Sequence, residues 1–483
     1  MVRKLGLILF YYLLGVVATV LVGYALYLRS LPDPGIPQIA ALDAEFTASR
    51  ADVRTLADYR QLEERVFAQL KERVYDRMPQ GERRQLNRYS SGSLADPLAR
   101  EPNWNRTFEW PAKAPRGGVL LLHGLTDSPY SMRAVGELAR ARGYWVVGLR
   151  FPGHGTAPSG LVSFTWQDMA AAARLAARDL KGKIGDAPLF VAGYSNGAAI
   201  AVEYALARLQ GEELPPLAGL ILFSPAIGVS PAARFAVWQG ELAAIPRLEA
   251  AAWTDIAPEY DPYKYASFSV NAADQVYRAT VAIQKRLDAL QASGGATGMP
   301  PILAFQSVAD ATVSTPAVVK ALFERLPAEG HELVFFDINR DAEIGTLMKP
   351  EVLTVHGDLL EKAPPLPFTL TALSNESQES ANVVAFRRVA GSTAIEREPI
   401  GVAWPPGVFS LSHVALPFTP EDPLYGAKPP EDDRTLYLGR MELLGERGLL
   451  AVPVGDMIRL RHNPFFPYVE KRIDAFLAAP PRR

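Results

Sequence analysis

The sequence predicts an α/β protein in which a mostly parallel sheet is covered by helices on both faces. Apolar runs of strand length, GGVLLLHG (117–124), YWVVGLR (144–150) and PLFVAGYS (188–195), alternate with amphipathic helical segments. A strand that is apolar at every position is buried on both faces, which is typical of parallel sheets. The 483 residues are enough for one elaborated domain of this kind and additional segments.

The alternation of strands and helices begins near residue 105, and we assign residues 105–483 to one domain. Besides the three runs above, we expect strands at TFEWP (107–111), LAGLILFSP (217–225), PPILAFQSV (300–308) and HELVFFDI (331–338). Helices are expected at about 131–141, 166–181, 197–210, 315–326 and 466–479. In such sheets the active site lies at the carboxyl ends of the strands, where glycines and polar residues follow each run.

Two segments interrupt this alternation. Residues from about 226 to 299 contain amphipathic helical stretches and few strands, and we expect them to form a helical cap over the carboxyl edge of the sheet. Residues from about 340 to 405 contain Pro-rich turns and two strand-like pieces, PFTLTAL (367–373) and NVVAFRRVA (382–390). We interpret this second segment as an insertion.

The N-terminus carries an apolar segment, and we predict that residues 1–29 form an uncleaved membrane anchor. Residues 5–28 contain no charged side chain. A helix of this length reaches about 36 Å, which is enough to span a hydrocarbon core of about 30 Å. A signal peptide, the alternative, has a shorter apolar core. Because Arg3 and Lys4 precede the segment, we expect a cytoplasmic N-terminus and an extracytoplasmic main domain, although Arg29 opposes this orientation.

Residues 30–104 are interpreted as a linker followed by a helical N-terminal extension. Residues 30–38 hold three prolines, which stiffen a linker. Residues 55–76 are helical in period, and we expect this helix to pack on the main domain or to space it from the membrane. Its apolar stripe consists of Leu56, Tyr59, Leu62, Val66, Leu70 and Val74.

A candidate nucleophile, Ser195, lies in FVAGYSNGAAI (190–200), between an apolar strand and an Ala-rich helix. A GxSxG sequence in this context is typical of a sharp turn that exposes a nucleophilic serine, whereas a plain Gly-rich turn is the alternative. Serine needs a base, a group that orients the base, and donors for the oxyanion. We expect these donors to be the backbone N–H groups of Asn196 and of Leu125 in LLLHGLTDSPYS (120–131).

Two histidines near this site are interpreted as structural. His123 lies directly at a strand end, where we expect it to brace the following loop through hydrogen bonds. His154, in FPGHGTAP (151–158), lies in a loop whose glycines and prolines fix an irregular path beside the site.

The orienting acid is predicted to be Asp310, which follows a late strand in QSVADATVS (306–314). Its neighbours are small, so the carboxylate can turn inward, whereas a helix cap is the alternative role. Asp337 and Asp341 are weaker candidates at the end of the last strand.

The base is predicted to be His413, in GVFSLSHVALPF (407–418), a loop that follows the insertion. The order Ser, Asp, His leaves four histidines after Asp310. His331 begins a strand and so lies at its wrong end, while His356 and His462 remain alternatives.

Composition excludes several other classes of site. The net charge of −2 argues against nucleic acid as the main partner. The absence of cysteine excludes disulfides, thiolate metal sites and a cysteine nucleophile. The six histidines lack metal-ligand spacing, and no GxGxxG or Walker sequence is present, so we expect neither a metal nor a nucleotide cofactor.

Together, the motifs GYSNG, LLLHGLTDSPYS, LRFPGHGTAP, SVADATV and SLSHVALPF resemble those of the α/β-hydrolase superfamily. The similarity is greatest to bacterial serine carboxylesterases, monoacylglycerol lipases and lysophospholipase-like members, and covers roughly residues 105–479 except 340–405. The resemblance implies the α/β-hydrolase fold, with Ser195 as nucleophile, Asp310 as acid, His413 as base, and Leu125 and Asn196 as oxyanion donors. The long interval between Asp310 and His413 departs from the family pattern.

The function expected from these features is that of a membrane-anchored serine hydrolase, which cleaves carboxylic esters of lipids or other acyl chains through an acyl-enzyme. Aromatic residues in the cap favour an apolar acyl group: Trp238, Trp253, Tyr260, Tyr263 and Tyr265. An acyltransferase or thioesterase with the same triad is the alternative within enzymes. A non-catalytic binding protein on a hydrolase scaffold is the alternative from another class, and the sequence leaves the oligomeric state open.

Overall fold

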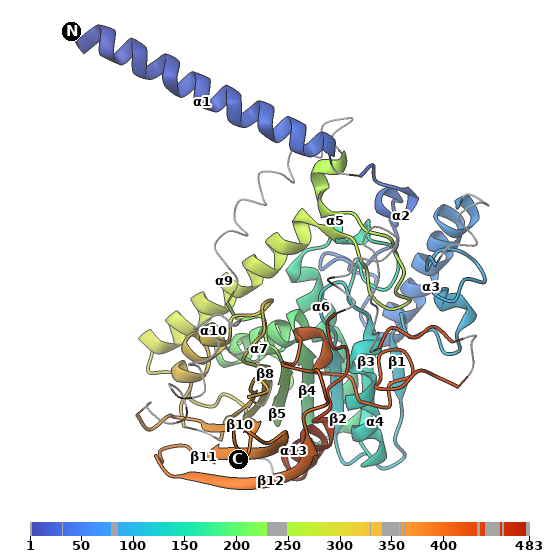
Figure 1. The fold of residues 1–483 in the computed structure, drawn as a ribbon. Helices are drawn as coiled ribbons and strands as arrows, with labels where there is room; N and C mark the ends of the chain where they lie inside the picture. Colours follow the sequence, from blue (N-terminus) through green and yellow to red (C-terminus); the bar gives the residue numbers. More distant parts are fainter. Residues whose placement is uncertain are drawn as a thin grey trace.

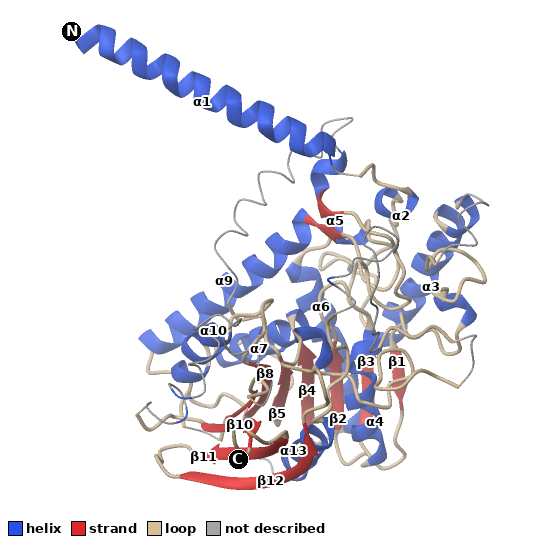
Figure 2. Cartoon of the chain, viewed as in Figure 1, coloured by secondary structure: helices blue, strands red, loops and turns tan. Residues whose placement is uncertain are grey.

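The computed structural model describes residues 2–30, 32–78, 86–228, 249–328, 330–340, 357, 360, 364–431, 435–439, 455 and 458–479. Its centre is one ten-stranded sheet with helices on both faces, as the sequence predicts (Figure 1). The strand order is β1-β3-β2-β4-β5-β8-β9-β10-β11-β12, and Figure 2 shows these strands as one layer.

The seven strands from β3 to β10 in this order run parallel to one another. The edge strand β1 and the far strands β11 and β12 pair antiparallel with their neighbours. The strands are β1 (Phe108–Trp110), β2 (Gly118–Leu122), β3 (Trp145–Leu149), β4 (Leu189–Tyr194), β5 (Gly219–Phe223), β8 (Ile302–Ser307), β9 (Glu332–Phe336), β10 (Thr369–Asn375), β11 (Asn382–Arg388) and β12 (Ile395–Ala403).

Alternate residues of the central strands pack into two separate cores, one on each face of the sheet. On one face, residues such as Leu120 and Val191 pack with α6 (Trp166–Ile184), α7 (Asn196–Leu209), α9 (Val270–Ala292) and α10 (Thr315–Ala321). On the other face, residues such as Leu121 and Ala192 pack with α4 (Arg133–Ala141) and α13 (Phe466–Ala478). Both faces of each central strand are therefore dry, which explains the uninterrupted apolar runs.

The segment from about 340 to 405 adds strands to the main sheet. Its two strand-like pieces form β10, parallel to β9, and β11, antiparallel to β10. The strand β12 was not predicted, because most of its side chains are exposed and its sequence, IEREPIGVA, is rich in charges. A strand on the outer edge of a sheet does not need the apolar pattern that reveals buried strands.

Of the cap segment from about 226 to 299, the structure describes residues 226–228 and 249–299. It contains a short ribbon of β6 (Trp253–Asp255) and β7 (Phe268–Ser269), and then α9, which includes the expected helical stretch at 272–290. The other expected stretch, residues 231–245 with Trp238, lies outside the described residues. The second half of α9 packs along α7, where Arg286 forms an ion pair with Glu203 at 3.1 Å.

At the N-terminus, α1 (Val2–Ser30) projects from the rest of the molecule (Figure 1). Its segment Lys4–Tyr27 has a mean hydropathy of 2.5 and no buried residue. Length and composition suffice for a membrane span, a property that an N-terminal signal sequence shares. The short helices α2 (Ile36–Ile39) and α5 (Gly160–Ser163) lie near its end.

The helix expected over 55–76 is α3 (Leu56–Arg73), which packs against the main domain. All six residues of its predicted apolar stripe are at most 4% exposed. Leu56, Tyr59 and Leu62 belong to the same core as the sheet residues on that face. The N-terminal extension is therefore part of the folded body of the protein.

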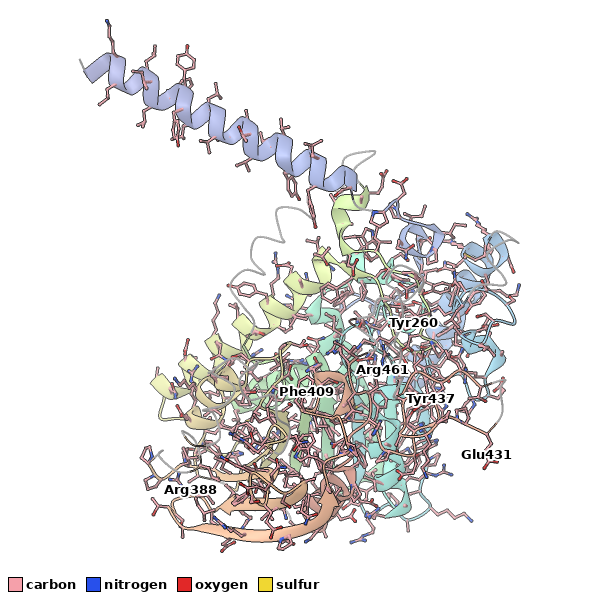
Figure 3. All side chains as sticks on the ribbon, viewed as in Figure 1. Tyr260, Arg388, Phe409, Glu431, Tyr437 and Arg461 are labelled. Atoms are coloured by element: carbon pink, nitrogen blue, oxygen red, sulfur yellow. The ribbon has the colours of Figure 1, made fainter. Side chains whose placement is uncertain are left out.

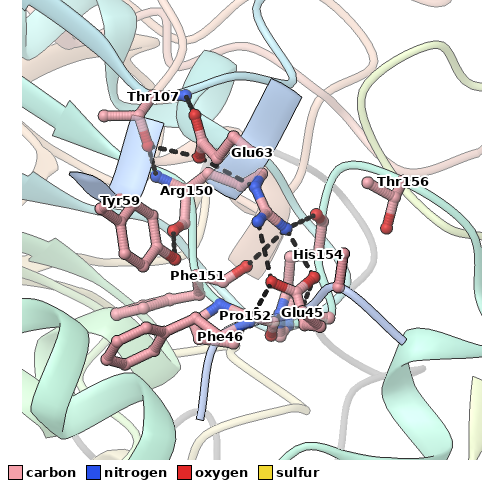
Figure 4. A network of polar contacts seen from close by, with 12 residues as sticks. Glu45, Phe46, Tyr59, Glu63, Thr107, Arg150, Phe151, Pro152, His154 and Thr156 are labelled. Carbon is pink, nitrogen blue, oxygen red and sulfur yellow. Dashed lines mark hydrogen bonds and ion pairs between the residues drawn. The ribbon is translucent and has the colours of Figure 1, made fainter. Parts of the chain in front are cut away.

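A buried ion network also joins this extension to the sheet (Figure 4). Arg150 follows β3 and its side chain is 0% exposed. Its guanidinium donates hydrogen bonds of 2.9 Å to both carboxylate oxygens of Glu45 and to Glu63 Oε1. Burial raises the pKa of Glu45, but the charge and hydrogen bonds of Arg150 outweigh it and lower that pKa overall. For Glu63 burial prevails, and the pKa is raised.

We predict that Arg150→Met lowers the free energy of unfolding by about 3–5 kcal/mol, because it leaves buried carboxylates without their cation. Urea unfolding of the detergent-solubilised chain, followed by tryptophan fluorescence, measures this loss. The exposed Arg116 provides the control, and its change to Met should alter stability by less than about 0.5 kcal/mol. A loss for Arg150→Met as small as that of the control would contradict the network's role.

Candidate active site

Ser195 occupies the turn between β4 and α7 alone. β4 ends at Tyr194 and α7 begins at Asn196, so a single residue reverses the chain with φ +53° and ψ −113°. The backbone of a residue other than glycine is strained at such a φ, and strain of this kind is common at functional sites. The turn is held by hydrogen bonds from Ser195 N–H to Phe223 O (2.8 Å) and from Ala226 N–H to Ser195 O (3.2 Å).

The two glycines of the GxSxG sequence are required by close packing around this turn. A Cβ on Gly193 would lie 2.6 Å from the Cα atom of Ala198. A Cβ on Gly197 would lie 2.2 Å from the carbonyl oxygen of Leu122, in the neighbouring strand β2. Both contacts are with backbone atoms that cannot move aside, so larger side chains are excluded on each side of Ser195.

The Asp310 carboxylate is fully buried and collects hydrogen bonds on both oxygens. Oδ2 accepts from His413 Nδ1 at 2.8 Å, Ser224 Oγ at 2.7 Å and Gln306 Nε2 at 3.2 Å. Oδ1 accepts from the backbone N–H groups of Thr312 at 2.8 Å and Val313 at 2.9 Å. Burial alone would raise the pKa of Asp310, but His413 and these donors outweigh burial and lower it. The carboxylate is therefore ionised at neutral pH.

The contact with Asp310 fixes the orientation of the His413 ring. Because an ionised carboxylate only accepts hydrogen bonds, the proton on the imidazole resides on Nδ1, and Nε2 is left as an acceptor. The ring of Tyr194 lies beside that of His413, with centroids 5.1 Å apart. An imidazole held in this way is suited to act as a general base.

The loop that carries His413 is fixed to the carboxyl ends of two strands. Ser307, the last residue of β8, donates from Oγ to Leu411 O at 2.8 Å. Asn339, just beyond β9, donates from its backbone N–H to Phe409 O at 2.8 Å and from Nδ2 to Val408 O at 3.0 Å. These contacts hold the loop near Asp310, although the strands β10, β11 and β12 lie between the two in the sequence.

Ser195 and His413 line the same cavity of about 280 Å³, which we call the serine cavity. Leu125 and Asn196, the predicted oxyanion donors, also line it. The structure thus brings together the residues singled out by the sequence, with Asp310 behind His413. Among the described residues, no hydrogen bond joins Ser195 to His413, and catalytic contacts of this kind often tighten only when substrate binds.

His123 and His154 are both buried and hold loops, in agreement with the sequence analysis. His123 Nδ1 donates to Gly124 O at 2.8 Å, and Nε2 accepts from Phe151 N–H at 3.0 Å. Burial lowers the pKa of His123 well below its usual value, so the ring is neutral. His154 Nδ1 contacts Pro152 O at 2.8 Å, and burial lowers its pKa to about 4.

The alternative acids and bases lie elsewhere. Asp337 accepts hydrogen bonds from Arg340 and Ser374. His331 accepts from Ile302 N–H at 3.2 Å, at the amino ends of β8 and β9. His462 is buried four residues before α13. The remaining two candidates, Asp341 and His356, lie outside the described residues.

Ser224 is the site residue that the sequence analysis missed. It follows β5, is fully buried, and has φ +42°, another strained value for a residue other than glycine. Its Oγ donates to the same oxygen of Asp310 as His413 does. The available signal was a hydroxyl residue directly after a buried strand, in LILFSP, but only the fold shows that Asp310 is its partner.

The fold and this site define the class of α/β-hydrolases, and the comparisons with known proteins agree. Residues 113–338 match the sequence model of the family described as serine aminopeptidase, S33. The thermostable monoacylglycerol lipase of Bacillus sp. (strain H-257) is 27% identical over 218 residues, which are 45% of this chain and 79% of that protein. The predicted resemblance to the α/β-hydrolase superfamily is confirmed: the chain has this fold and is similar to lipases and esterases, which are serine hydrolases.

Solved structures of similar proteins include two lipolytic groups. The structure reported for LipS and LipT, metagenome-derived lipolytic enzymes, has 25% identity and a TM-score of 0.38, over 49% of this chain and 88% of that chain. The monoacylglycerol lipase of Paleococcus ferrophilus has 20% identity and a TM-score of 0.35, over 48% of this chain and 87% of that chain.

The buried His154 makes stability depend on pH in a defined direction. Its pKa is about 4 in the folded protein and 6.5 when unperturbed, so below pH 6.5 the unfolded chain binds a proton that the folded protein does not. The free energy of unfolding therefore decreases as the pH is lowered. For this residue the decrease from pH 7 to pH 5 is about 2 kcal/mol.

We predict that His154→Asn removes this contribution. Urea unfolding at pH 7 and pH 5 should show a pH-dependent loss of stability smaller by about 2 kcal/mol in the variant than in the wild type. The difference between the two pH values is compared, so a constant packing loss in the variant cancels. Equal pH dependence in both proteins would contradict a neutral His154.

Proposed function

We propose that the protein is a membrane-anchored carboxylic-ester hydrolase that acts through Ser195, His413 and Asp310. The observation that carries this proposal is the 2.8 Å hydrogen bond from His413 Nδ1 to the buried Asp310 carboxylate, in the wall of the cavity that Ser195 also lines. An oriented imidazole beside a serine in a strained strand-to-helix turn is the arrangement that nucleophilic catalysis requires.

In the proposed reaction, His413 Nε2 removes the proton from Ser195 Oγ as this oxygen attacks the ester carbonyl carbon. The carbonyl oxygen becomes an oxyanion, which the N–H groups of Leu125 and Asn196 stabilise. The C–O bond to the alcohol then breaks, and His413 gives the proton to the leaving alcohol. Water, deprotonated by His413, then attacks the acyl-enzyme. The bond between the acyl carbon and Ser195 Oγ breaks, His413 returns the proton to this oxygen, and the acid is released.

The walls of the serine cavity favour an apolar acyl group. Its lining includes five apolar residues: Ala226, Phe268, Ala273, Val276 and Val313. An alkyl chain placed against them gains about 25 cal/mol for each Å² of apolar surface removed from water. The similarity to a monoacylglycerol lipase also supports an acyl ester of a lipid as substrate.

The proposed division of the chain is an anchor at 1–29, a linker and extension at 30–104, and the hydrolase domain at 105–483. The linker is docked on the hydrolase domain: Gln38 Nε2 donates to Ser267 Oγ at 3.1 Å, and Ser159 N–H donates to Pro37 O at 3.1 Å. A membrane-spanning α1 would thus hold the cap and the active-site edge close to the lipid surface. We propose that this domain is extracytoplasmic.

We predict that Ser195→Ala lowers kcat for hydrolysis of a monoacylglycerol and a p-nitrophenyl ester by roughly 10⁴- to 10⁶-fold. Labelling by a fluorophosphonate probe should disappear in the same variant, because the probe reacts with an activated serine. Ser293→Ala, at the exposed end of α9, is the matched control and should retain activity.

Full activity of the Ser195→Ala variant would exclude Ser195 as the nucleophile. Product analysis with a competing alcohol distinguishes hydrolysis, which yields the free acid, from acyl transfer, which yields a new ester. The proposal expects the free acid as the main product.

A further inference from the structure

A second cavity of about 200 Å³ adjoins the serine cavity, and we call it the polar cavity. The two share a wall formed by Thr126, Asp127, Tyr194, Lys264, Phe268, Val414 and Arg459. Ala226, Ala273, Val276 and Val313 line the serine cavity but not the polar cavity. The combined space is therefore aliphatic at one end and carries aromatic and charged side chains at the other, with Ser195 on the aliphatic side of the shared wall.

The polar cavity is lined by three cationic and two anionic side chains, and two of the cations have anionic partners. Arg461 lies 3.5 Å from Asp261 and also donates to Tyr260 Oη at 3.1 Å; Figure 3 labels Tyr260 and Arg461. Lys264 Nζ lies 4.0 Å from Asp127 Oδ1, at the limit of an ion pair. These contacts leave one cation in excess.

The third cation is Arg459, which has no anionic partner among the described residues. Within the part of the chain that the structure describes, its guanidinium has no hydrogen bond, ion pair or ring contact, although it is half-buried. It lines the serine cavity, the polar cavity and a third, more open cavity of about 600 Å³ beside His413. A partly desolvated guanidinium with free donors is suited to bind an anion, above all a phosphate through two parallel hydrogen bonds.

We propose that Arg459, assisted by Lys264, binds a phosphate on the alcohol part of the ester, while the acyl chain occupies the apolar end of the serine cavity. This inference rests on the proposed ester hydrolysis and adds the substrate class: acyl esters whose alcohol carries a phosphate. The scissile carbonyl then lies at Ser195, between the apolar and polar ends. Arg459 lies outside residues 113–338, the part that matches the family.

The test uses the full chain in detergent and two substrates with the same acyl chain, dodecanoyl glycerol phosphate and dodecanoyl glycerol. Arg459→Gln should lower kcat/KM for the phosphate-bearing ester by about 10- to 100-fold, mainly through KM, because a charge-assisted contact is lost. Hydrolysis of the neutral ester should fall much less, so that the ratio of the two kcat/KM values reports the lost contact with phosphate. Arg459→Lys retains the charge and should lose less.

Arg116→Gln is the matched control, because Arg116 is exposed and precedes β2, at the sheet edge opposite the active site. It should leave hydrolysis of both esters unchanged. Equal losses on the two esters in Arg459→Gln, or no loss on the phosphate-bearing ester, would overturn the inference. If the wild type instead cleaves neither ester in a Ser195-dependent way, the proposed function itself fails.

Inorganic phosphate provides a further arm that separates a substrate group from a free anion. The proposal expects it to compete with the phosphate-bearing ester in the wild type and to lose this effect in Arg459→Gln. Arg459-dependent inhibition by inorganic phosphate without any preference for the phosphate-bearing ester would indicate a site for the free anion, and would overturn the assignment to the substrate.

Discussion

The hydrogen bond between His413 and Asp310 joins two parts of the chain that are 103 residues apart. The strands β10, β11 and β12 separate these two residues along the chain. The proposed catalytic site can form only because this contact brings His413 back to Asp310. After β9 the chain adds three more strands to the sheet, and must then return to the carboxyl end of β8. Ser307 and Asn339 hold the returning loop at the ends of β8 and β9, so the imidazole reaches a carboxylate that is already desolvated and saturated with donors.

The same edge of the sheet depends on buried polar groups with satisfied partners. His123 fixes the loop of the predicted oxyanion donor Leu125 to the segment after β3, and Arg150 fixes that segment to Glu45 and Glu63 of the N-terminal extension. An extension that could have been only a spacer is thereby part of the site's support. Such groups can be buried because each has a hydrogen-bond or ionic partner. If one partner is removed, the other stays buried without compensation, and its desolvation penalty lowers the stability of the protein.

The strands that carry Ser195 and Asp310 could be predicted because their signal is local. A buried strand followed by a turn with a polar residue is visible in a short window, since the strand pattern and the turn residues are adjacent. The signal was weaker for His413, which was favoured over other histidines by chain order and not by its surroundings. The exposed edge strand β12 was not predicted, because its charged residues hide the pattern of a strand. Nor were Ser224 and Arg459, because the proposed roles of these side chains depend on residues that are distant in sequence.

The choice of base is tested most directly by the rate constant for phosphonylation of Ser195 by a fluorophosphonate, in wild type, His413→Gln and His462→Gln. The probe needs an activated serine and no substrate recognition. We expect His413→Gln to lower the rate constant by about 10²- to 10⁴-fold and His462→Gln to leave it near the wild-type value. Rapid labelling in a folded His413→Gln variant, with slow labelling in His462→Gln, would contradict the central role of the contact between His413 and Asp310.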